Sequence, residues 1–183
     1  MYIIGGKLKG RKLANCKIGS IRPAMALVRK SIFDTLKDFV VNASILDLCA
    51  GSGALGIEAL SRGAGDLTLV DSNKDAIKLI YKNLELCKLK AKVVFGKLPK
   101  VLNKIDVKNK SFNLIFLDPP YGRSDFIENV LKVLILNKLI AKDGLISIES
   151  EEKCNFLLPG ELQLYKEKKY GNTRVTFLKQ VII

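Results

Sequence analysis

No histidine occurs among the 183 residues of the chain. This absence excludes a histidine general base, a Ser-His-Asp or Cys-His nucleophilic site, and a metal site with histidine ligands. The four cysteines are widely spaced and form no C-x-x-C pair, which argues against a zinc site and against a disulfide framework. Chemistry in this protein must therefore rely on carboxylates, backbone groups, aromatic rings and a bound cofactor, and we expect no metal.

Long apolar runs are also missing. No stretch approaches the roughly 20 apolar residues that a membrane-spanning helix requires. The first seven residues, Met1 to Lys7, do not form a basic region followed by an apolar one, so no signal peptide is expected. We therefore expect a globular, cytoplasmic protein with no membrane partner.

Acidic residues are few in comparison with basic ones, 18 against 31, which gives a net charge of +13. The excess is uneven, because residues 1–44 carry nine basic and two acidic side chains, a net charge of +7. A quarter of the chain thus holds more than half of the positive excess. This distribution is typical of a surface that binds phosphates.

Hydrophobic periodicity predicts strands that alternate with helices. Strands are expected at 45–49, 66–71, 91–95, 112–117 and 144–149, and helices at about 23–40, 54–62, 74–87 and 124–138. Two further strands, at about 161–169 and 173–182, are expected to form a terminal hairpin. The order predicts one α/β domain over residues 1–183, with a seven-stranded, mostly parallel sheet and an antiparallel C-terminal hairpin. Residues 1–22 are expected to add a small basic β-hairpin.

The segment Ser44 to Gly56 reads as a strand, a glycine-rich turn and the start of a helix. Gly51 and Gly53 permit positive φ and leave no Cβ between the loop and a ligand. The helix N-terminus adds free N–H groups. This arrangement predicts a nucleotide-type site at the carboxyl end of a central strand.

Two cofactors compete for this loop. The spacing of Gly51, Gly53 and Gly56 fits G-x-G-x-x-G, which is typical of NAD-binding oxidoreductases. Asp47 favours SAM (S-adenosylmethionine) over NAD, because Asp47, Gly51 and Gly53 form D-x-x-x-G-x-G, which resembles motif I of SAM methyltransferases. An acidic residue can complement the sulfonium and α-amino cations of SAM. Asp71, about twenty residues beyond the loop, ends the second strand where a carboxylate would bind ribose hydroxyls.

Asp118-Pro119-Pro120-Tyr121 directly follows the fourth predicted strand. The two prolines fix φ, so Asp118 and Tyr121 are held with little freedom beside the ligand crevice. The carboxylate and a backbone carbonyl can accept N–H bonds from a planar amine, while the ring stacks on the base.

The two motifs together resemble those of amino-group methyltransferases of nucleic acids, which carry [DNS]-P-P-[YFW]. A wider set of segments is similar to the RsmD family, whose members methylate the N2 amine of a guanine in small-subunit (16S) ribosomal RNA. These segments are Ile3-Ile4-Gly5-Gly6, Gly10-Arg11-Lys12-Leu13, Arg22-Pro23, Gly51-Ser52-Gly53-Ala54-Leu55-Gly56, Glu58 to Ala64, Asp118 to Tyr121, and Tyr170-Gly171-Asn172-Thr173.

The resemblance implies a Rossmann-like class I methyltransferase, monomeric, whose partner is small-subunit rRNA or an assembling 30S subunit. It assigns the target amine to Asp118, Pro119, Pro120 and Tyr121. It assigns SAM to Asp47, Cys49, Ala50, Gly51, Ser52, Gly53, Asp71, Ser72, Lys97 and Leu98. The uneven charge assigns RNA phosphates to Lys7, Lys9, Arg11, Lys12, Arg22 and Arg29, which lie in the most basic quarter of the chain. The alternatives are a DNA adenine-N6 methyltransferase, an NAD-binding oxidoreductase, and an RNA-binding protein with an inactive methyltransferase fold.

Overall fold

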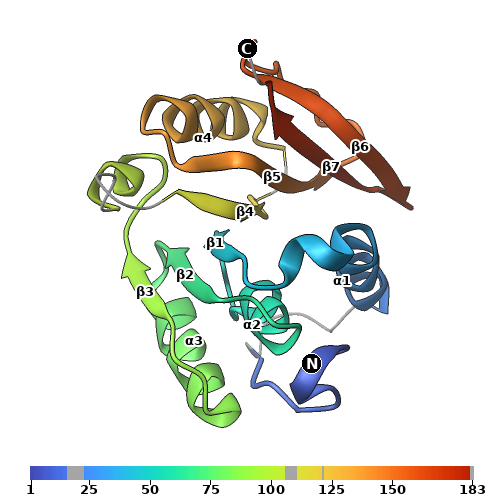
Figure 1. Cartoon of the computed structure of the whole chain (residues 1–183), viewed down its shortest axis with the longest axis vertical. Coiled ribbons are helices and arrows are strands. Elements are labelled where there is room, and N and C mark those ends of the chain that lie inside the picture. The colour runs from blue at the N-terminus through green and yellow to red at the C-terminus, as the bar shows by residue number, and fades with distance from the viewer. Residues whose placement is uncertain (16–22, 106–110, 121, 182–183) are drawn as a thin grey trace.

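The structure is a computed structural model that describes residues 1–15, 23–105, 111–120 and 122–181. Seven strands form one sheet in the order β3-β2-β1-β4-β5-β7-β6 (Figure 1). Their bounds are β1 Ser44–Leu48, β2 Asp66–Asp71, β3 Lys92–Phe95, β4 Phe112–Leu117, β5 Ile140–Glu151, β6 Leu162–Tyr170 and β7 Thr173–Gln180. The strands β1 to β5 are parallel, and β7 pairs antiparallel with both β5 and β6. The predicted mostly parallel sheet with an antiparallel C-terminal hairpin is confirmed.

Helices cover both faces of this sheet. The helices are α1 Pro23–Leu36, α2 Ala54–Ser61, α3 Lys74–Cys87 and α4 Ser124–Leu136, and short 3-10 turns lie at η1 Gly6–Leu8, η2 Lys37–Val40 and η3 Lys100–Lys104. The helices α1, α2 and α3 pack against one face of the sheet and share one hydrophobic core cluster with it. The elements α4 and η3 pack against the other face and share a second cluster. Successive strand residues alternate between the two, as Ile45 lies in the first and Leu46 in the second. A sheet that is buried on both faces explains why its strands read as continuous apolar runs.

Local sequence signals set most of the element boundaries. Asn73 caps α3, since its side chain accepts the backbone N–H groups of Asp75 at 2.7 Å and Ala76 at 3.3 Å. Strand β5 begins at Ile140, four residues earlier than predicted, because the polar Lys142 and Asp143 interrupt the apolar pattern there without ending the strand.

In the described part of the chain, no helix combines the length and the apolar character that crossing a membrane would require.

The N-terminal segment forms the predicted β-hairpin only in part. Its two arms share one antiparallel bridge, between Tyr2 and Lys12, and η1 forms the turn between them. Backbone hydrogen bonds also join the arms, from Ile3 N–H to the Arg11 carbonyl at 3.0 Å and from Leu13 N–H to the Met1 carbonyl at 2.9 Å. The pairing ends after Ile3, because the next backbone N–H groups are bonded to α2 instead. Glu58 accepts the N–H groups of Ile4 and Gly5, at 2.8 and 2.7 Å. The segment is therefore a loop fixed to a helix of the main fold, with a basic tip as predicted.

Candidate functional site

The carboxyl ends of the parallel strands meet at one edge of the sheet, and the loop after β1 lies there. The Asp71 carboxylate holds this loop, because its Oδ2 accepts the N–H of Gly51 at 2.8 Å and its Oδ1 accepts the N–H of Asn73 at 2.8 Å. Gly51 has φ +56°, and a Cβ added there would meet no atom closer than 4.0 Å. Its backbone therefore borders open space, where a ligand can approach closely.

Asp47 does not lie in that space, contrary to the prediction that it complements the charges of SAM. Its side chain is 1% exposed, and its Oδ2 accepts the N–H of Gly56 in the first turn of α2 at 2.9 Å. A Cβ at position 56 would lie 2.6 Å from Leu67 and 3.0 Å from this carboxylate, so the third glycine of the motif allows helix and strand to approach. Burial raises the pKa of Asp47 to about 7. Asp47 therefore stabilises the junction between the loop and α2 through its bond to Gly56, and does not face the ligand space.

A cleft of about 740 Å³ opens at this edge of the sheet, a size typical of a cofactor or small-ligand site. Its lining includes the carboxyl ends of β1 to β4 and Glu149, two residues before the end of β5. Nine of the predicted site residues line it: Cys49, Gly51, Asp71, Ser72, Lys97, Leu98, Asp118, Pro119 and Pro120. Six residues that sequence reasoning missed line it as well: Asn73, Ala76, Gly96, Arg123, Phe126 and Glu149.

The other predicted site residues are placed differently. Asp47, Ala50, Ser52 and Gly53 do not line the cleft. Tyr121 and Arg22 lie outside the described residues. Burial raises the pKa of Cys49 to about 12, so its thiol stays neutral and is not a nucleophile at neutral pH. In the ranges that the structure describes, no group of three or more His, Cys, Asp or Glu side chains could hold a metal ion.

Two carboxylates from neighbouring strands lie in this cleft, Asp118 directly after β4 and Glu149 near the end of β5. Leu117 of β4 pairs with Ile148 of β5, and Asp118 and Glu149 are the next residue of each strand's path. Burial and the charge of Glu149 raise the pKa of Asp118 well above its ordinary value, and burial raises the pKa of Glu149. The sequence does contain a signal for Glu149. It is the last residue of the strand predicted at 144–149, just as Asp118 directly follows the strand predicted at 112–117.

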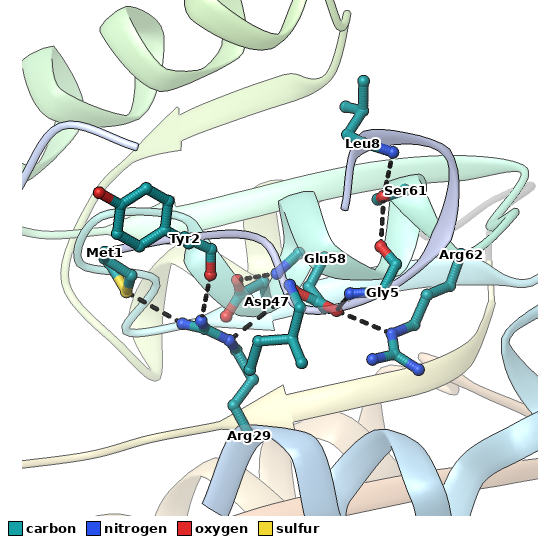
Figure 2. Close-up of polar contacts among 11 residues, drawn as sticks. Met1, Tyr2, Gly5, Leu8, Arg29, Asp47, Glu58, Ser61 and Arg62 are labelled. Atoms are coloured by element: carbon teal, nitrogen blue, oxygen red, sulfur yellow. Dashed lines mark hydrogen bonds and ion pairs between the residues drawn. The ribbon is translucent and has the colours of Figure 1, made fainter. Parts of the chain in front are cut away.

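Arg29 was predicted to bind RNA, and the structure contradicts this. The residue is 7% exposed, and its Nη2 donates to the carbonyl of Tyr2 at 2.6 Å while its Nη1 donates to Met1 Sδ at 2.9 Å. Its Nε lies 3.8 Å from Glu58 Oε2. Figure 2 shows Arg29 and Arg62 on either side of this carboxylate, below the N-terminal loop. Arg29 holds that loop against the main fold and has no surface left for a polyanion.

The remaining basic residues of the N-terminal segment do form a surface. Lys7, Lys9, Arg11 and Lys12 are exposed and, with Leu8, Gly10 and Leu86 of α3, line a depression of about 550 Å³. We call these four side chains the basic rim. Four cations around one hollow form an electrostatically favourable place for phosphates.

The sequence matches the protein family described as Conserved hypothetical protein 95 over residues 1–179. It is 36% identical over 169 residues to the Ribosomal RNA small subunit methyltransferase D of Buchnera aphidicola subsp. Acyrthosiphon pisum, covering 92% of this chain and 87% of that protein. The protein of the same name from Escherichia coli strain K12 is 36% identical over 171 residues, with 92% and 84% covered.

Solved structures share this fold. The putative methyltransferase yhhF from Escherichia coli superposes with a TM-score of 0.86 at 34% identity, and covers 98% of this chain and 97% of its own. A putative methyltransferase complexed with SAH has a TM-score of 0.70 at 14% identity, which shows likeness of fold alone. Because the family match spans 1–179 and relatives at 36% identity cover 92% of the chain, the protein belongs to the RsmD family that its motifs resemble.

Proposed function

We propose that this protein is a SAM-dependent methyltransferase that modifies the N2 amine of a guanine in 16S rRNA. The observation that carries the proposal is the shared cleft: Gly51 and Asp71 of the cofactor loop line the same cavity as Asp118 and Pro119. A methyl donor and an amine acceptor must meet within one site. The relatives are named Ribosomal RNA small subunit methyltransferase D, and these names support methyl transfer to small-subunit rRNA.

The cofactor loop fits SAM better than a dinucleotide. Asp71 retains lone pairs beyond the two that bind Gly51 and Asn73, so its carboxylate can also accept ribose hydroxyls. Gly96, Lys97 and Leu98 lie beyond β3, where the adenine ring is expected. SAM, when bound, supplies a methyl group on a cationic sulfur, and the acidic lining of the cleft suits that charge. An NAD enzyme would leave Asp118 and its two prolines without a use.

The target amine is assigned to the Asp118 side of the cleft. The Asp118 carboxylate and the Pro119 carbonyl would each accept one N2 hydrogen, and the ring of Tyr121 would stack on the base. Two such bonds orient the nitrogen lone pair and draw electron density onto it, which matters because guanine delocalises that pair into its ring. The target base must be unstacked to enter, which looped or single-stranded RNA allows at low cost.

The basic rim is the proposed contact for RNA phosphates. Its four cations lie on the loop that Glu58 fixes to α2, and α2 begins at the cofactor loop. Phosphates bound at the rim would therefore be held at a defined place relative to the cleft. We propose a monomer that acts in the cytoplasm, where rRNA and assembling 30S subunits are found.

Transfer of tritium from labelled SAM tests this function. The substrates are 30S subunits that lack the modification, the naked 16S rRNA from them, and 50S subunits as a control. We expect label in the 30S subunits or their rRNA and none in 50S subunits. Asp118→Ala should abolish transfer while leaving the affinity for SAM, measured by calorimetry, within a few-fold. Equal labelling of both subunits, or none of either, would contradict the proposal.

A further inference from the structure

We propose that Glu149 binds the N1–H of the target guanine and is the residue that selects guanine over adenine. The inference rests on the proposed function and assigns to Glu149 a substrate contact of its own, beside the amine contacts of Asp118 and Pro119. Glu149 is not part of the motif Asp118 to Tyr121. It lies in β5, a different part of the chain.

The placement of Glu149 is the first argument. β4 and β5 are adjacent parallel strands, and the pair Leu117 and Ile148 lies directly before Asp118 and Glu149. Neighbouring strands are separated by about 4.8 Å, so the two carboxylates enter the cleft side by side. A flat base that offers an N–H to Asp118 therefore offers its adjacent ring position to Glu149.

The second argument is that the two carboxylates lack protein donors. Within residues 1–15, 23–105, 111–120 and 122–181, no hydrogen bond or ion pair reaches the side chain of Asp118 or of Glu149. Both residues are half-buried in the lining of the cleft, where burial raises the pKa of each and the charge of Glu149 also raises that of Asp118. Carboxylates that are half-buried in a cleft and have no protein donor must take their hydrogen bonds from solvent or from a ligand. A ligand with two neighbouring N–H donors would satisfy both groups at once.

Guanine and adenine differ in the group that lies next to the target amine. Guanine presents its N1–H donor next to the N2 amine, whereas adenine presents an N1 lone pair next to its N6 amine. A carboxylate at Glu149 binds the first arrangement and is repelled by the second. Sites built to bond a substrate N–H reject analogues that lack it by factors of about 10⁴ or more, whereas apolar pockets discriminate far less. Asp118 and Pro119 alone accept either amine and cannot supply this selection.

Replacement of guanine by 2-aminopurine in the RNA tests the inference. This base keeps the amine at C2 and lacks the N1–H. The guanine that the wild-type protein methylates is located first, and RNA with either base there is then assayed for kcat, KM and binding affinity. We expect wild type to prefer guanine by at least about 100-fold in kcat/KM. Glu149→Gln, whose amide N–H can donate to the bare N1, should bring that preference to within a few-fold of unity.

Controls separate this result from a folding defect and from failure of the proposed function. Glu151→Gln, two residues further along β5 and outside the cleft lining, should keep the wild-type preference. Affinity for SAM reports whether Glu149→Gln is folded. If wild type methylates guanine N2 and accepts 2-aminopurine equally well, the assignment of Glu149 is overturned without any variant. An unchanged preference in folded Glu149→Gln also overturns it. If wild type methylates no guanine N2, the proposed function and this inference fail together.

Discussion

The Glu58 carboxylate accepts the backbone N–H of Gly5 at 2.7 Å, across 53 positions of sequence. Its two oxygens also bind Ile4 N–H and Arg62 Nε, both at 2.8 Å, and Arg29 Nε lies 3.8 Å away. Glu58 is fully buried. One carboxylate on α2 therefore fixes both the N-terminal loop and two arginines, and with them the position of the basic rim.

Glu58→Gln is expected to destabilise the protein by about 3 kcal/mol. The change leaves the charges of Arg29 and Arg62 without their anion, and breaking a buried ion pair on one side typically costs about 3–5 kcal/mol. Urea unfolding measures the difference. The control is Asp34→Asn, which removes the exposed Lys30–Asp34 pair and should cost less than about 1 kcal/mol. Equal effects of the two changes would show that the Glu58 contacts contribute little.

Sequence reasoning succeeded where the signal was local. The five parallel strands, the Asn73 cap and the cleft-forming loops follow from apolar runs, turn residues and the rule that ligands bind at strand carboxyl ends. It failed where a long-range partner decides the outcome. Arg29 looks like a surface cation on a helix, and only the folded N-terminal loop and Glu58 bury it. The early start of β5 depends on pairing with β4, which no local pattern reveals.

Asp47→Asn is expected to change how stability depends on pH. The folded-state pKa of Asp47 is about 7, above its ordinary value of 3.8, so the folded protein keeps a proton that the unfolded chain releases in this range. The stabilising contribution of the protonated group is complete below about pH 4 and is lost as pH rises through 7. Each pKa unit corresponds to about 1.4 kcal/mol. Asparagine cannot titrate and can still accept the Gly56 N–H.

Urea unfolding of wild type and Asp47→Asn at pH 4.5 and pH 8 measures this effect. The stability of the variant relative to wild type should rise by about 2 kcal/mol or more between the two pH values. A difference that stays constant with pH would mean that Asp47 is ionised in the folded protein throughout. Asp34, which is exposed, provides a matched control when changed to asparagine.

Asp71→Ala is expected to weaken SAM binding by roughly 10- to 100-fold, because a charge-assisted hydrogen bond contributes about 1.5–3 kcal/mol. Calorimetry with SAM measures the loss. Asp75→Ala, which removes an exposed carboxylate four residues away on α3, should leave the affinity nearly unchanged. SAM affinity that is the same in Asp71→Ala and wild type would place the ribose elsewhere.

Changing Lys7, Lys9 and Arg11 together to alanine is expected to weaken RNA binding and flatten its salt dependence. Each lost phosphate contact lowers the slope of log K against log salt by about 0.7–0.9, so the slope should fall by about two to three units. Lys132 of α4, Lys138 and Lys142 of β5 are exposed and lie outside both the N-terminal segment and the cleft lining, so they provide a control triple with the same change in charge. If both triples shift the slope equally, the basic rim is not a specific RNA contact.

The identity of the methylated nucleoside shows which amine the protein methylates. Small-subunit rRNA labelled by the wild-type protein from tritiated SAM is digested to nucleosides and separated beside N2-methylguanosine and N6-methyladenosine standards. We expect the label to elute with N2-methylguanosine. Label in N6-methyladenosine would contradict the account, since it would mean that the cleft formed by Asp118, Pro119 and Glu149 accepts the amine of adenine.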